Sequence, residues 1–264
     1  MNGFAGKLSD ILNAFSADHD SIYRHYNTAV IVAAGNGARM GKNNDLTKQM
    51  TPLDGIPVVV RAIEAFEKCK AINEIVVVAR ADEIPLYDGF RDVYGFHKLV
   101  RVVCGGPTRQ KSVLAGFEAI SDRTEYVAIH DGARCLVTPA MIEAVLRQAY
   151  IYGSATAAER SKDTVKKGDH SGFIGETIDR SYLWHAQTPQ IFRTEIYRAA
   201  AYIARENEFE ATDDCMLAEN IGFRIKLVDC GYENLKITTP DDFYLASAIL
   251  RMRKDREAAA GSIS

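Results

Sequence analysis

The segment from Ala29 to Gly41 constrains the fold most, because an apolar run there leads directly into a glycine-rich turn. The run over residues 29–34 has the composition of a buried strand, and the turn after it carries Gly35, Gly37 and Arg39. Glycine lacks a Cβ atom and adopts positive φ, so such a turn can direct several backbone N–H groups toward one anion. The segment therefore predicts a strand followed by a phosphate-binding turn. An ordinary glycine-rich strand-to-helix turn is the alternative.

Two common phosphate-binding motifs do not fit this turn. The Walker loop, G-x-x-x-x-G-K-[ST], requires a hydroxyl residue after its lysine, whereas Asn43 follows Lys42 here. The dinucleotide fingerprint, G-x-G-x-x-G, fits Gly35 and Gly37 but has Met40 in place of its third glycine. The turn therefore favours a nucleotide binder of another kind.

Strand-like and helix-like segments alternate from Thr28 onward. The predicted strands cover residues 29–34, 74–79, 99–103, 126–130 and 224–228. The predicted helices cover residues 57–69, 110–120, 139–152 and 194–205, and two more begin near residues 212 and 240. Thr138 is placed to cap the third of these helices, and Pro139 suits its first turn. This alternation predicts an α/β fold with a mixed, mostly parallel sheet flanked by helices.

Residues 159–182 interrupt the alternation. β-Branched residues are mixed there with Lys166-Lys167-Gly168-Asp169 and Ser171-Gly172, which is a hairpin-like composition with little apolar content. A hairpin that cannot bury both of its faces needs a partner surface, so the segment predicts a projecting β-arm and a homodimer. A mobile loop is the alternative.

The chain divides into an N-terminal extension (1–27), a main domain (28–250, with the β-arm at 159–182) and a tail (251–264). In the extension, Ile11, Leu12, Phe15 and Ile22 recur at near-helical spacing. The tail is charged and then rich in alanine and serine, and we expect it to fray.

Composition excludes several classes of function. The 264 residues are 47% hydrophobic and carry a net charge of only −3, so neither a nucleic-acid surface nor a polybasic membrane patch is indicated. No apolar run approaches the length of a membrane span. The five cysteines are scattered and form no C-x-x-C pair, which favours buried thiols in a reducing, cytoplasmic protein.

Candidate site residues follow the predicted strands, where ligands of open α/β sheets bind. Two cations, Arg39 and Lys48, flank the first glycine turn. A second turn, Gly105-Gly106, leads into a helix whose opening turns carry Arg109 and Ser112. An acid and a base, Asp131 and Arg134, follow the strand at 126–130.

Further candidates lie later in the chain: Thr164, Arg180, Thr188, Thr212 and Lys236. Each alone has an ordinary explanation, such as a surface ion pair or a helix cap. Together, cations placed after separate strands indicate a site that gathers several phosphates. His130 and His185 lie beside these motifs, but no partner arrangement supports either one as a general base.

These motifs, in this order, resemble those of the 2-C-methyl-D-erythritol 4-phosphate cytidylyltransferase family of the non-mevalonate isoprenoid pathway. The resemblance covers residues 28–250 and rests on Ala33-Ala34-Gly35-x-Gly-x-Arg39-Met40, Lys48-Gln49, Gly105-Gly106-x-x-Arg109-Gln-x-Ser112-Val, Asp131-x-Ala-Arg134, Lys162-Asp163-Thr164-Val-Lys166, Asp179-Arg180-x-x-Leu-Trp-x-x-Gln187-Thr188-Pro189-Gln190-x-Phe, Thr212-Asp213-Asp214 and Asn234-Leu-Lys236-Ile-Thr-x-Pro-x-Asp.

The resemblance implies a Rossmann-like nucleotidyltransferase fold and a CTP-dependent reaction. The phosphate of the substrate would attack the α-phosphorus of CTP, pyrophosphate would leave, and a divalent cation, normally Mg²⁺, would span the triphosphate. A phosphate is already a nucleophile and needs no base, so catalysis would depend on alignment and charge neutralisation.

The resemblance also assigns roles to the candidate residues. It implies that Arg39, Lys48 and Lys236 are catalytic and act on the phosphates with Gly35 and Gly37. A CTP-binding pocket would contain Ala33, Ala34, Gly106, Arg109 and Ser112. A pocket for the polyol phosphate would contain Asp131, Arg134, Thr164, Arg180, Thr188 and Thr212, with Thr164 and Arg180 supplied by the β-arm of a dimer partner.

Two other functions fit the same residues. A ribitol 5-phosphate cytidylyltransferase would share the fold and most of the cations, although Lys162-Asp163-Thr164 and Thr108-Arg109-Gln110 favour the erythritol enzyme. A protein that binds CTP without turnover would be expected to lack one of the catalytic cations, yet Arg39, Lys48 and Lys236 are all present.

Overall fold

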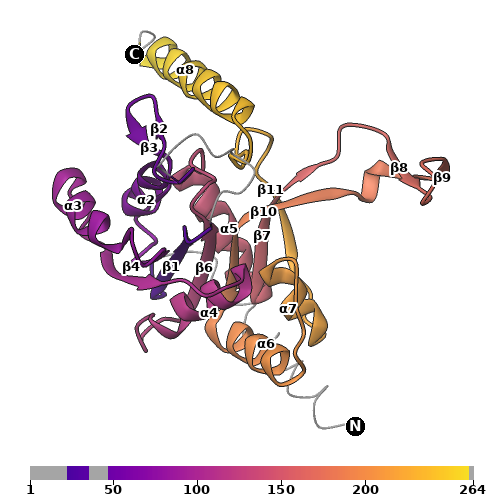
Figure 1. The fold of residues 1–264 in the computed structure, drawn as a ribbon, viewed down its shortest axis with the longest axis horizontal. Coiled ribbons are helices and arrows are strands. Elements are labelled where there is room, and N and C mark those ends of the chain that lie inside the picture. Colours follow the sequence, from indigo (N-terminus) through magenta and orange to yellow (C-terminus); the bar gives the residue numbers. More distant parts are fainter. Residues whose placement is uncertain (1–22, 36–46, 262–264) are drawn as a thin grey trace.

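The computed structural model describes residues 23–35 and 47–261, and Gly37, Arg39 and most of the loop at 42–49 lie outside these residues. A seven-stranded sheet in the order β11-β7-β10-β6-β1-β4-β5 forms the centre of the molecule (Figure 1). Its strands are β1 (Asn27–Val32), β4 (Glu74–Ala79), β5 (Leu99–Cys104), β6 (Tyr126–Asp131), β7 (Ser154–Arg160), β10 (Trp184–Arg193) and β11 (Lys226–Asp229).

The sheet is mixed and mostly parallel, as the sequence predicts. Strand β1 pairs in parallel with β4 and β6, β4 with β5, and β11 with β7. Only β10 is reversed among these strands, because it runs antiparallel to both β6 and β7. The carboxyl ends of β1, β5 and β6 therefore meet at one edge of the sheet, where ligands of α/β folds bind.

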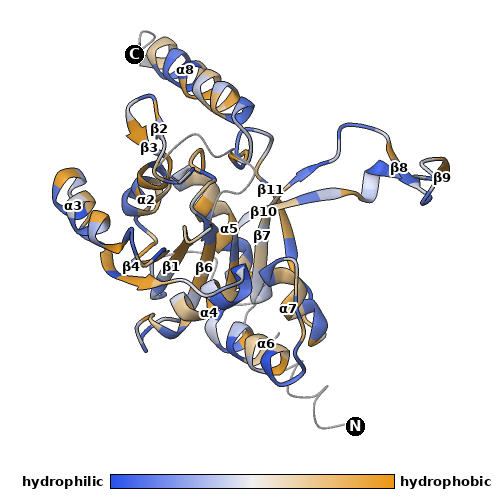
Figure 2. Cartoon of the chain, in the orientation of Figure 1, coloured by the Kyte–Doolittle hydropathy of each residue, from blue (hydrophilic) through white to orange (hydrophobic). Residues whose placement is uncertain are grey.

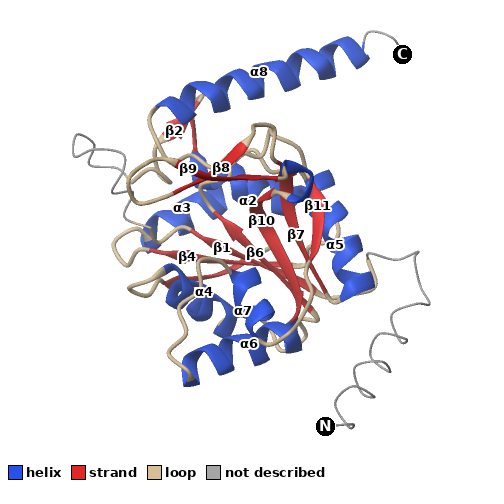
Figure 3. Cartoon of the chain, turned by 90° about the vertical axis from the view of Figure 1, so that its right-hand side faces the viewer, coloured by secondary structure: helices blue, strands red, loops and turns tan. Residues whose placement is uncertain are grey.

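Helices cover both faces of the sheet (Figure 3). One face packs against α2 (Val58–Lys68), α3 (Ile84–Tyr94) and α5 (Pro139–Tyr152). The other face packs against α4 (Arg109–Glu118), α6 (Thr194–Glu206) and α7 (Asp214–Asn220). Strand β1 is buried on both faces of the sheet, because Ala29 and Ile31 pack into the core on one face and Val30 packs into the core on the other. Its continuously apolar run is explained by this double burial. Figure 2 shows hydrophobic residues concentrated in these central strands.

Several helices begin as their sequences predict. The Thr138 hydroxyl accepts a hydrogen bond from the backbone N–H of Met141 at 3.3 Å, which confirms the predicted cap of α5. Helix α4 begins one residue earlier than predicted, where Thr108 accepts from the N–H of Lys111. Helix α7 begins at Asp214, capped by Asp213.

The segment between β7 and β10 contains a separate antiparallel pair, β8 (Val165–Gly168) with β9 (Ile174–Ile178), and a short 3₁₀ turn, η2 (Arg180–Tyr182). Figure 1 shows β8 and β9 well away from the central sheet, on the right of the view. A second small pair, β2 (Pro52–Leu53) with β3 (Ile56–Pro57), precedes α2.

The C-terminal helix α8 (Asp241–Gly261) continues past Leu250, so the prediction that the chain frays there was wrong. Arg253 explains the difference, because its Nε donates to Glu233 at 2.8 Å and its Nη1 donates to the Leu136 carbonyl at 2.8 Å. Arg256 adds a second bond to Glu233. None of the helices within residues 23–35 and 47–261 has the length and apolar character needed to cross a bilayer.

Candidate active site

A cleft of about 280 Å³ opens at the carboxyl ends of β1, β5 and β6. Residues that are far apart in the sequence line it together, from the turn after β1 to the loop before α8. The predicted site residues among them are Ala34, Gly35, Lys48, Gly106, Arg109, Ser112, Asp131 and Lys236. These eight candidate residues therefore lie around one cleft.

The first glycine turn forms one wall of this cleft. Ala33 is buried and its N–H donates to the carbonyl of Val78 at 2.7 Å, which fixes the chain as it leaves β1. Ala34 and Gly35 follow it into the wall. A Cβ atom on Gly35 would lie 3.4 Å from the Gln49 amide nitrogen, so this turn lies next to the segment that carries Lys48.

The second glycine turn, Gly105-Gly106, has no room for a Cβ atom at either position. A Cβ atom on Gly105 would lie 2.3 Å from the Cβ atom of Ala34, and one on Gly106 would lie 2.7 Å from the Cβ atom of Lys111. The hydroxyl of Ser112 closes the turn, since it accepts from the N–H of Gly106 at 3.1 Å and donates to the Thr108 carbonyl at 2.9 Å. The close packing of the two turns brings the amino end of α4 to the cleft.

Asp131 forms ion pairs with two of the cations that line the cleft. Lys236 donates from Nζ to Asp131 Oδ2 at 2.6 Å, and Arg109 donates from Nε to Asp131 Oδ1 at 3.1 Å. Lys236 is 105 residues away from Asp131 in the sequence, and the fold brings them together at the end of β6. Among the described residues that line the cleft there are three cations, Lys48, Arg109 and Lys236, and this single carboxylate. The excess of positive charge suits a polyphosphate.

The ion pairs keep Asp131 ionised. Burial alone would raise the pKa of its carboxyl, but the charges of Arg109 and Lys236 outweigh this effect and hold the pKa well below its usual range. The same carboxylate orients both cations before any ligand binds. An entering phosphate would compete with Asp131 for Arg109 and Lys236.

Asp214 holds Arg109 on the side away from Asp131, although the sequence indicated Asp214 only as part of the motif Thr212-Asp213-Asp214. Its side chain is buried and accepts from Arg109 Nη1 at 2.8 Å and from the Tyr197 hydroxyl at 3.1 Å. Gln190 accepts from the N–H of Asp214 at 3.0 Å and so fixes the first turn of α7. Arg109 is therefore held between two carboxylates. The only signal of this support in the sequence was the presence of Gln190 and Asp214 within the motifs quoted above.

His130 acts as a buried connector rather than as an exposed base. Burial lowers its pKa to about 4, so the ring is neutral at physiological pH. Its Nε2 lies 3.1 Å from the Arg134 carbonyl, which can only accept, so Nε2 carries the hydrogen. The Nδ1 atom then accepts from the Thr188 hydroxyl at 3.1 Å, and that hydroxyl accepts from the N–H of Asp131 at 3.0 Å. This chain of bonds sets the geometry of the Asp131–Arg134 turn.

The remaining predicted residues have other locations. Arg134 follows Ala133, which lines the cleft, and its Nη1 donates to the Asn234 carbonyl at 2.8 Å. Thr212 is exposed near the start of α7, and its hydroxyl contacts the Met216 sulfur. Thr164 and Arg180 are exposed on the segment between β7 and β10 and do not line this cleft, and Arg180 donates to the Lys162 carbonyl. Gly37 and Arg39 lie outside the described residues.

Comparison with known proteins identifies the family. The family model for 2-C-methyl-D-erythritol 4-phosphate cytidylyltransferase (IspD) matches residues 27–252. The chain belongs to this family. A curated cytidylyltransferase of this name from Pelotomaculum thermopropionicum is 42% identical over 234 residues, which cover 88% of this chain and 98% of that protein. Another from Caldanaerobacter subterraneus is 42% identical over 225 residues, covering 85% of this chain and 98% of that protein.

Solved structures of the cytidylyltransferase family share the fold. The 4-diphosphocytidyl-2C-methyl-D-erythritol synthase of Anaerococcus prevotii has a TM-score of 0.76 at 29% identity and covers 86% of this chain and 99% of its own. The cytidylyltransferase from Thermus thermophilus has a TM-score of 0.69 at 28% identity, with 84% and 98% covered. Fold and sequence therefore agree on a nucleotidyltransferase of the isoprenoid pathway.

Proposed function

We propose that this chain transfers the cytidylyl group of CTP to 2-C-methyl-D-erythritol 4-phosphate, giving 4-diphosphocytidyl-2-C-methyl-D-erythritol and pyrophosphate. The observation that carries the proposal is one cleft at the strand ends that is lined by Lys48, Arg109 and Lys236, with Arg109 and Lys236 paired to Asp131. Membership of the cytidylyltransferase family supports the choice of substrates.

The reaction is an in-line displacement at phosphorus. An oxygen of the polyol phosphate forms a new bond to the α-phosphorus of CTP, and the bond between that phosphorus and the bridging oxygen to the β-phosphate breaks. The electron pair of the broken bond leaves with pyrophosphate. Since the attacking oxygen is already anionic, no proton has to be removed, and the neutral, buried His130 has no such task.

The catalytic roles are assigned to cations. We propose that Arg39, Lys48 and Lys236 neutralise the charge that builds up on the five-coordinate phosphorus and on the leaving pyrophosphate, with Gly35 and Gly37 close to the phosphates. The position of Lys48 and Lys236 on one cleft supports this assignment for those two residues. Arg39 is assigned by its place in the family motif.

The two substrates are assigned to neighbouring parts of the site. We propose that CTP binds against the two glycine turns, through Ala33, Ala34, Gly106, Arg109 and Ser112, where the amino end of α4 adds positive potential. The polyol phosphate would then contact Asp131, Arg134, Thr188 and Thr212 of one chain, together with Thr164 and Arg180 of a second copy.

A homodimer completes this second pocket in our proposal. Thr164 directly precedes β8 and Arg180 follows β9, and neither residue lines the cleft of its own chain. Figure 1 shows the β8–β9 pair well away from the central sheet. At the turn between β8 and β9, the side chains of Phe173 and Ile174 are 73% and 67% exposed. Large apolar side chains that are exposed in one chain suit burial against another surface. We propose that the segment is a β-arm that reaches the cleft of a second copy.

Complementation tests the dimer directly. An Arg180→Ala chain has an intact cleft and a defective arm, whereas a Lys236→Ala chain has the reverse. Mixing the two variants after partial dissociation should create one intact site in each mixed dimer and restore pyrophosphate release. Mixed chains that form dimers yet remain as inactive as the separate variants would contradict an arm that acts on the partner's cleft.

Mg²⁺ is the proposed cofactor. No group of three or more His, Cys, Asp and Glu side chains that could hold a metal ion occurs in residues 23–35 and 47–261, and Asp131 is the only carboxylate among the described residues that line the cleft. Such a cationic lining suits an ion that arrives with the triphosphate, with Asp131 as the nearest protein carboxylate. When bound, the ion would supply charge neutralisation and orient the phosphates.

We further propose that residues 28–250 make up the catalytic domain, that 1–27 and 251–264 are additions to it, and that the protein works in the cytoplasm.

The experiment that tests the function is a pyrophosphate-release assay with CTP, Mg²⁺ and either 2-C-methyl-D-erythritol 4-phosphate or ribitol 5-phosphate. Release with the erythritol phosphate alone is expected. Release only with ribitol 5-phosphate would assign the other substrate, and CTP binding without release from either would indicate a nucleotide sensor.

A further inference from the structure

Lys236 stands on a segment that has no regular secondary structure. This segment, residues 230–240, connects β11 to α8 and contains no helix or strand. A functional side chain on such a segment is placed less precisely than one on a helix or strand, unless packing and hydrogen bonds fix its neighbours. The position of the Lys236 ammonium beside Asp131 therefore depends on what holds the residues on either side of the lysine.

Asn234 fixes this segment on the amino side of Lys236. Its side chain is fully buried, and its Nδ2 atom donates to the Gln187 side-chain oxygen Oε1 and to the Thr188 carbonyl, both at 2.9 Å. The backbone carbonyl of Asn234 accepts from Arg134 Nη1 at 2.8 Å. One residue thus joins the segment to β10 and to the turn after β6.

An irregularity in β10 supplies the two acceptors of this amide. The pairing register of β10 with β7 shifts over residues 186–190, so Gln187 and Thr188 lie outside the regular ladder. Irregularities of this kind turn backbone and side-chain groups in directions that a regular strand does not offer. Gln187 is itself fixed, because its Nε2 donates to the Gly231 carbonyl at 3.3 Å. The Asn234 amide is therefore attached to a well-anchored part of the sheet.

Ile237 fixes the segment on the carboxyl side of Lys236. Its N–H donates to the Ala133 carbonyl at 2.9 Å, and its side chain is fully buried in an apolar cluster that includes Val58 and Leu136. The Lys236 side chain between these two anchors is 33% exposed. The backbone around the lysine is therefore held on both sides, while its ammonium group is open to the cleft.

We propose that Asn234 is a positioning residue for Lys236. Its amide keeps the lysine at the place where the ammonium group meets the phosphates of the proposed reaction, and the inference rests on that proposed function. Asn234 is not among the described residues that line the cleft, so it acts through Lys236. Without the amide the segment keeps only the anchor at Ile237 beside the lysine. A displacement of about 1 Å at an active-site group can lower the rate by a factor of about 10².

A double-mutant cycle on pyrophosphate release tests the proposal. With CTP and the accepted polyol phosphate at saturation, Asn234→Ala should lower kcat at least about tenfold. In a Lys236→Ala chain the same substitution should change kcat by less than about twofold, because the group that it positions is already absent. Equal fold-losses in the two backgrounds would overturn the proposal, and so would a kcat of Asn234→Ala within about threefold of the original.

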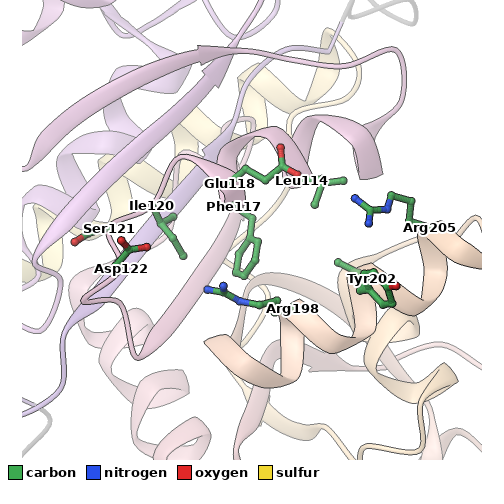
Figure 4. Close-up of a pocket in the computed structure, with 10 residues that line it drawn as sticks. Leu114, Phe117, Glu118, Ile120, Ser121, Asp122, Arg198, Tyr202 and Arg205 are labelled. Carbon is green, nitrogen blue, oxygen red and sulfur yellow. The ribbon is translucent and has the colours of Figure 1, made fainter.

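Asn27→Ala is the matched control. Asn27 is also fully buried, and its Nδ2 donates to the Ala71 carbonyl at 2.7 Å, but it lies at the start of β1, at the opposite end of that strand from the cleft. Its loss should lower the melting temperature and leave kcat unchanged. Tyr202→Ala is an exposed control, because Tyr202 lines a pocket of about 300 Å³ between α4 and α6 that shares no lining residue with the cleft (Figure 4). A fall in kcat in Asn27→Ala as large as that in Asn234→Ala would overturn the proposal.

Acetylation of lysines tests the same inference without the reaction. The hydrogen bond to Asp131 withholds the Lys236 ammonium from acetic anhydride, and mass spectrometry would compare its labelling with that of the exposed Lys226. In the ligand-free protein, Asn234→Ala should speed the labelling of Lys236 at least about threefold, and Asn27→Ala should not. Unchanged labelling would overturn the inference even in an active enzyme. An original chain that releases no pyrophosphate would instead overturn the proposed function and leave the labelling result to decide the inference.

Gln187→Ala is a second variant for both experiments. It removes one of the two acceptors of the Asn234 amide and should give the same pattern to a smaller degree. It decides the proposal if Asn234→Ala does not fold. A loss of kcat in Gln187→Ala that is equally large with and without Lys236, or labelling of Lys236 at the original rate, would then overturn it.

Discussion

Replacement of Lys236 by alanine should abolish most of the turnover while leaving the fold almost intact. The ammonium group lies 2.6 Å from the Asp131 carboxylate, and the side chains are 33% and 11% exposed. A pair of unit charges about 4 Å apart contributes about 4 kcal/mol at an effective dielectric constant near 20. Desolvation and solvent screening offset most of this, and Asp131 keeps Arg109, so we expect a loss of about 1 kcal/mol in the free energy of unfolding. The melting temperature should fall by only about 2–4 °C.

The effect on catalysis should be much larger. Loss of one preorganised group that stabilises transition-state charge costs about 2.7–4 kcal/mol, or a factor of about 10²–10³ in kcat. The assay is steady-state pyrophosphate release with saturating CTP and polyol phosphate, together with thermal unfolding of the same samples. Lys236→Arg keeps the charge and should recover part of the rate. Lys226→Ala, an exposed lysine on β11, is the matched control and should change neither quantity.

Two results would refute this reasoning. A Lys236→Ala enzyme with a kcat within a few-fold of the original would remove Lys236 from the transition state. A large fall in melting temperature that parallels the loss of turnover would instead make Lys236 a structural residue.

Four further predictions concern Lys48, Arg180, Asp131 and His130. Lys48→Ala should also lower kcat by a factor of about 10² with unchanged thermal unfolding, and normal turnover would exclude a role on the phosphates. Arg180→Ala should raise the KM for the polyol phosphate and leave CTP affinity unchanged, as measured by titration calorimetry; an unchanged KM would remove it from that pocket. Asp131 has a folded-state pKa below its ordinary value of 3.8, so its contribution to stability is present above that pH and is lost as the pH falls below it. The difference in unfolding free energy between the original chain and Asp131→Asn should therefore shrink below about pH 4, and a constant difference would contradict the ion pairs. Because the pKa of His130 is lowered to about 4, kcat should show no break near the ordinary histidine value of about 6.5, and a break there that disappears in His130→Gln would contradict a reaction without a base.

The central parallel part of the fold could be predicted because its signals are local. The apolar run of β1 lies between two cores, so its sequence is continuously hydrophobic. The Thr138 cap and Pro139 mark the start of α5 through hydrogen bonds within one turn. The position of Asp131 at a strand end was likewise sufficient to place it at the ligand-binding edge of the sheet.

Helix α3 and strands β7 and β10 were not predicted from the sequence, because their own residues do not favour a helix or a strand. Helix α3 contains Pro85 and Gly89, which weaken a helical pattern, and only Tyr87 of this helix is buried. Strand β7 has alanine, which has little β propensity, at three of its seven positions, and β10 carries polar Gln187 and Gln190 in its buried stretch. Pairing with neighbouring strands stabilises both, and that information lies elsewhere in the chain.

The sequence indicated which residues lie near one another in the cleft, but not the contacts between them. Spacing along the chain indicated that Arg109, Asp131 and Lys236 would lie at the same edge of the sheet. It could not show that one carboxylate would hold both cations, or that Asp214 would anchor Arg109 from α7. These contacts depend on tertiary distances between segments about a hundred residues apart in the chain.

A structure of the protein bound to CTP and Mg²⁺ tests the central claim most directly. We predict that the Lys48 and Lys236 ammonium groups and the Arg39 guanidinium lie within hydrogen-bonding distance of the triphosphate, with the cytosine ring against the second glycine turn. A triphosphate bound away from these three cations would contradict the account.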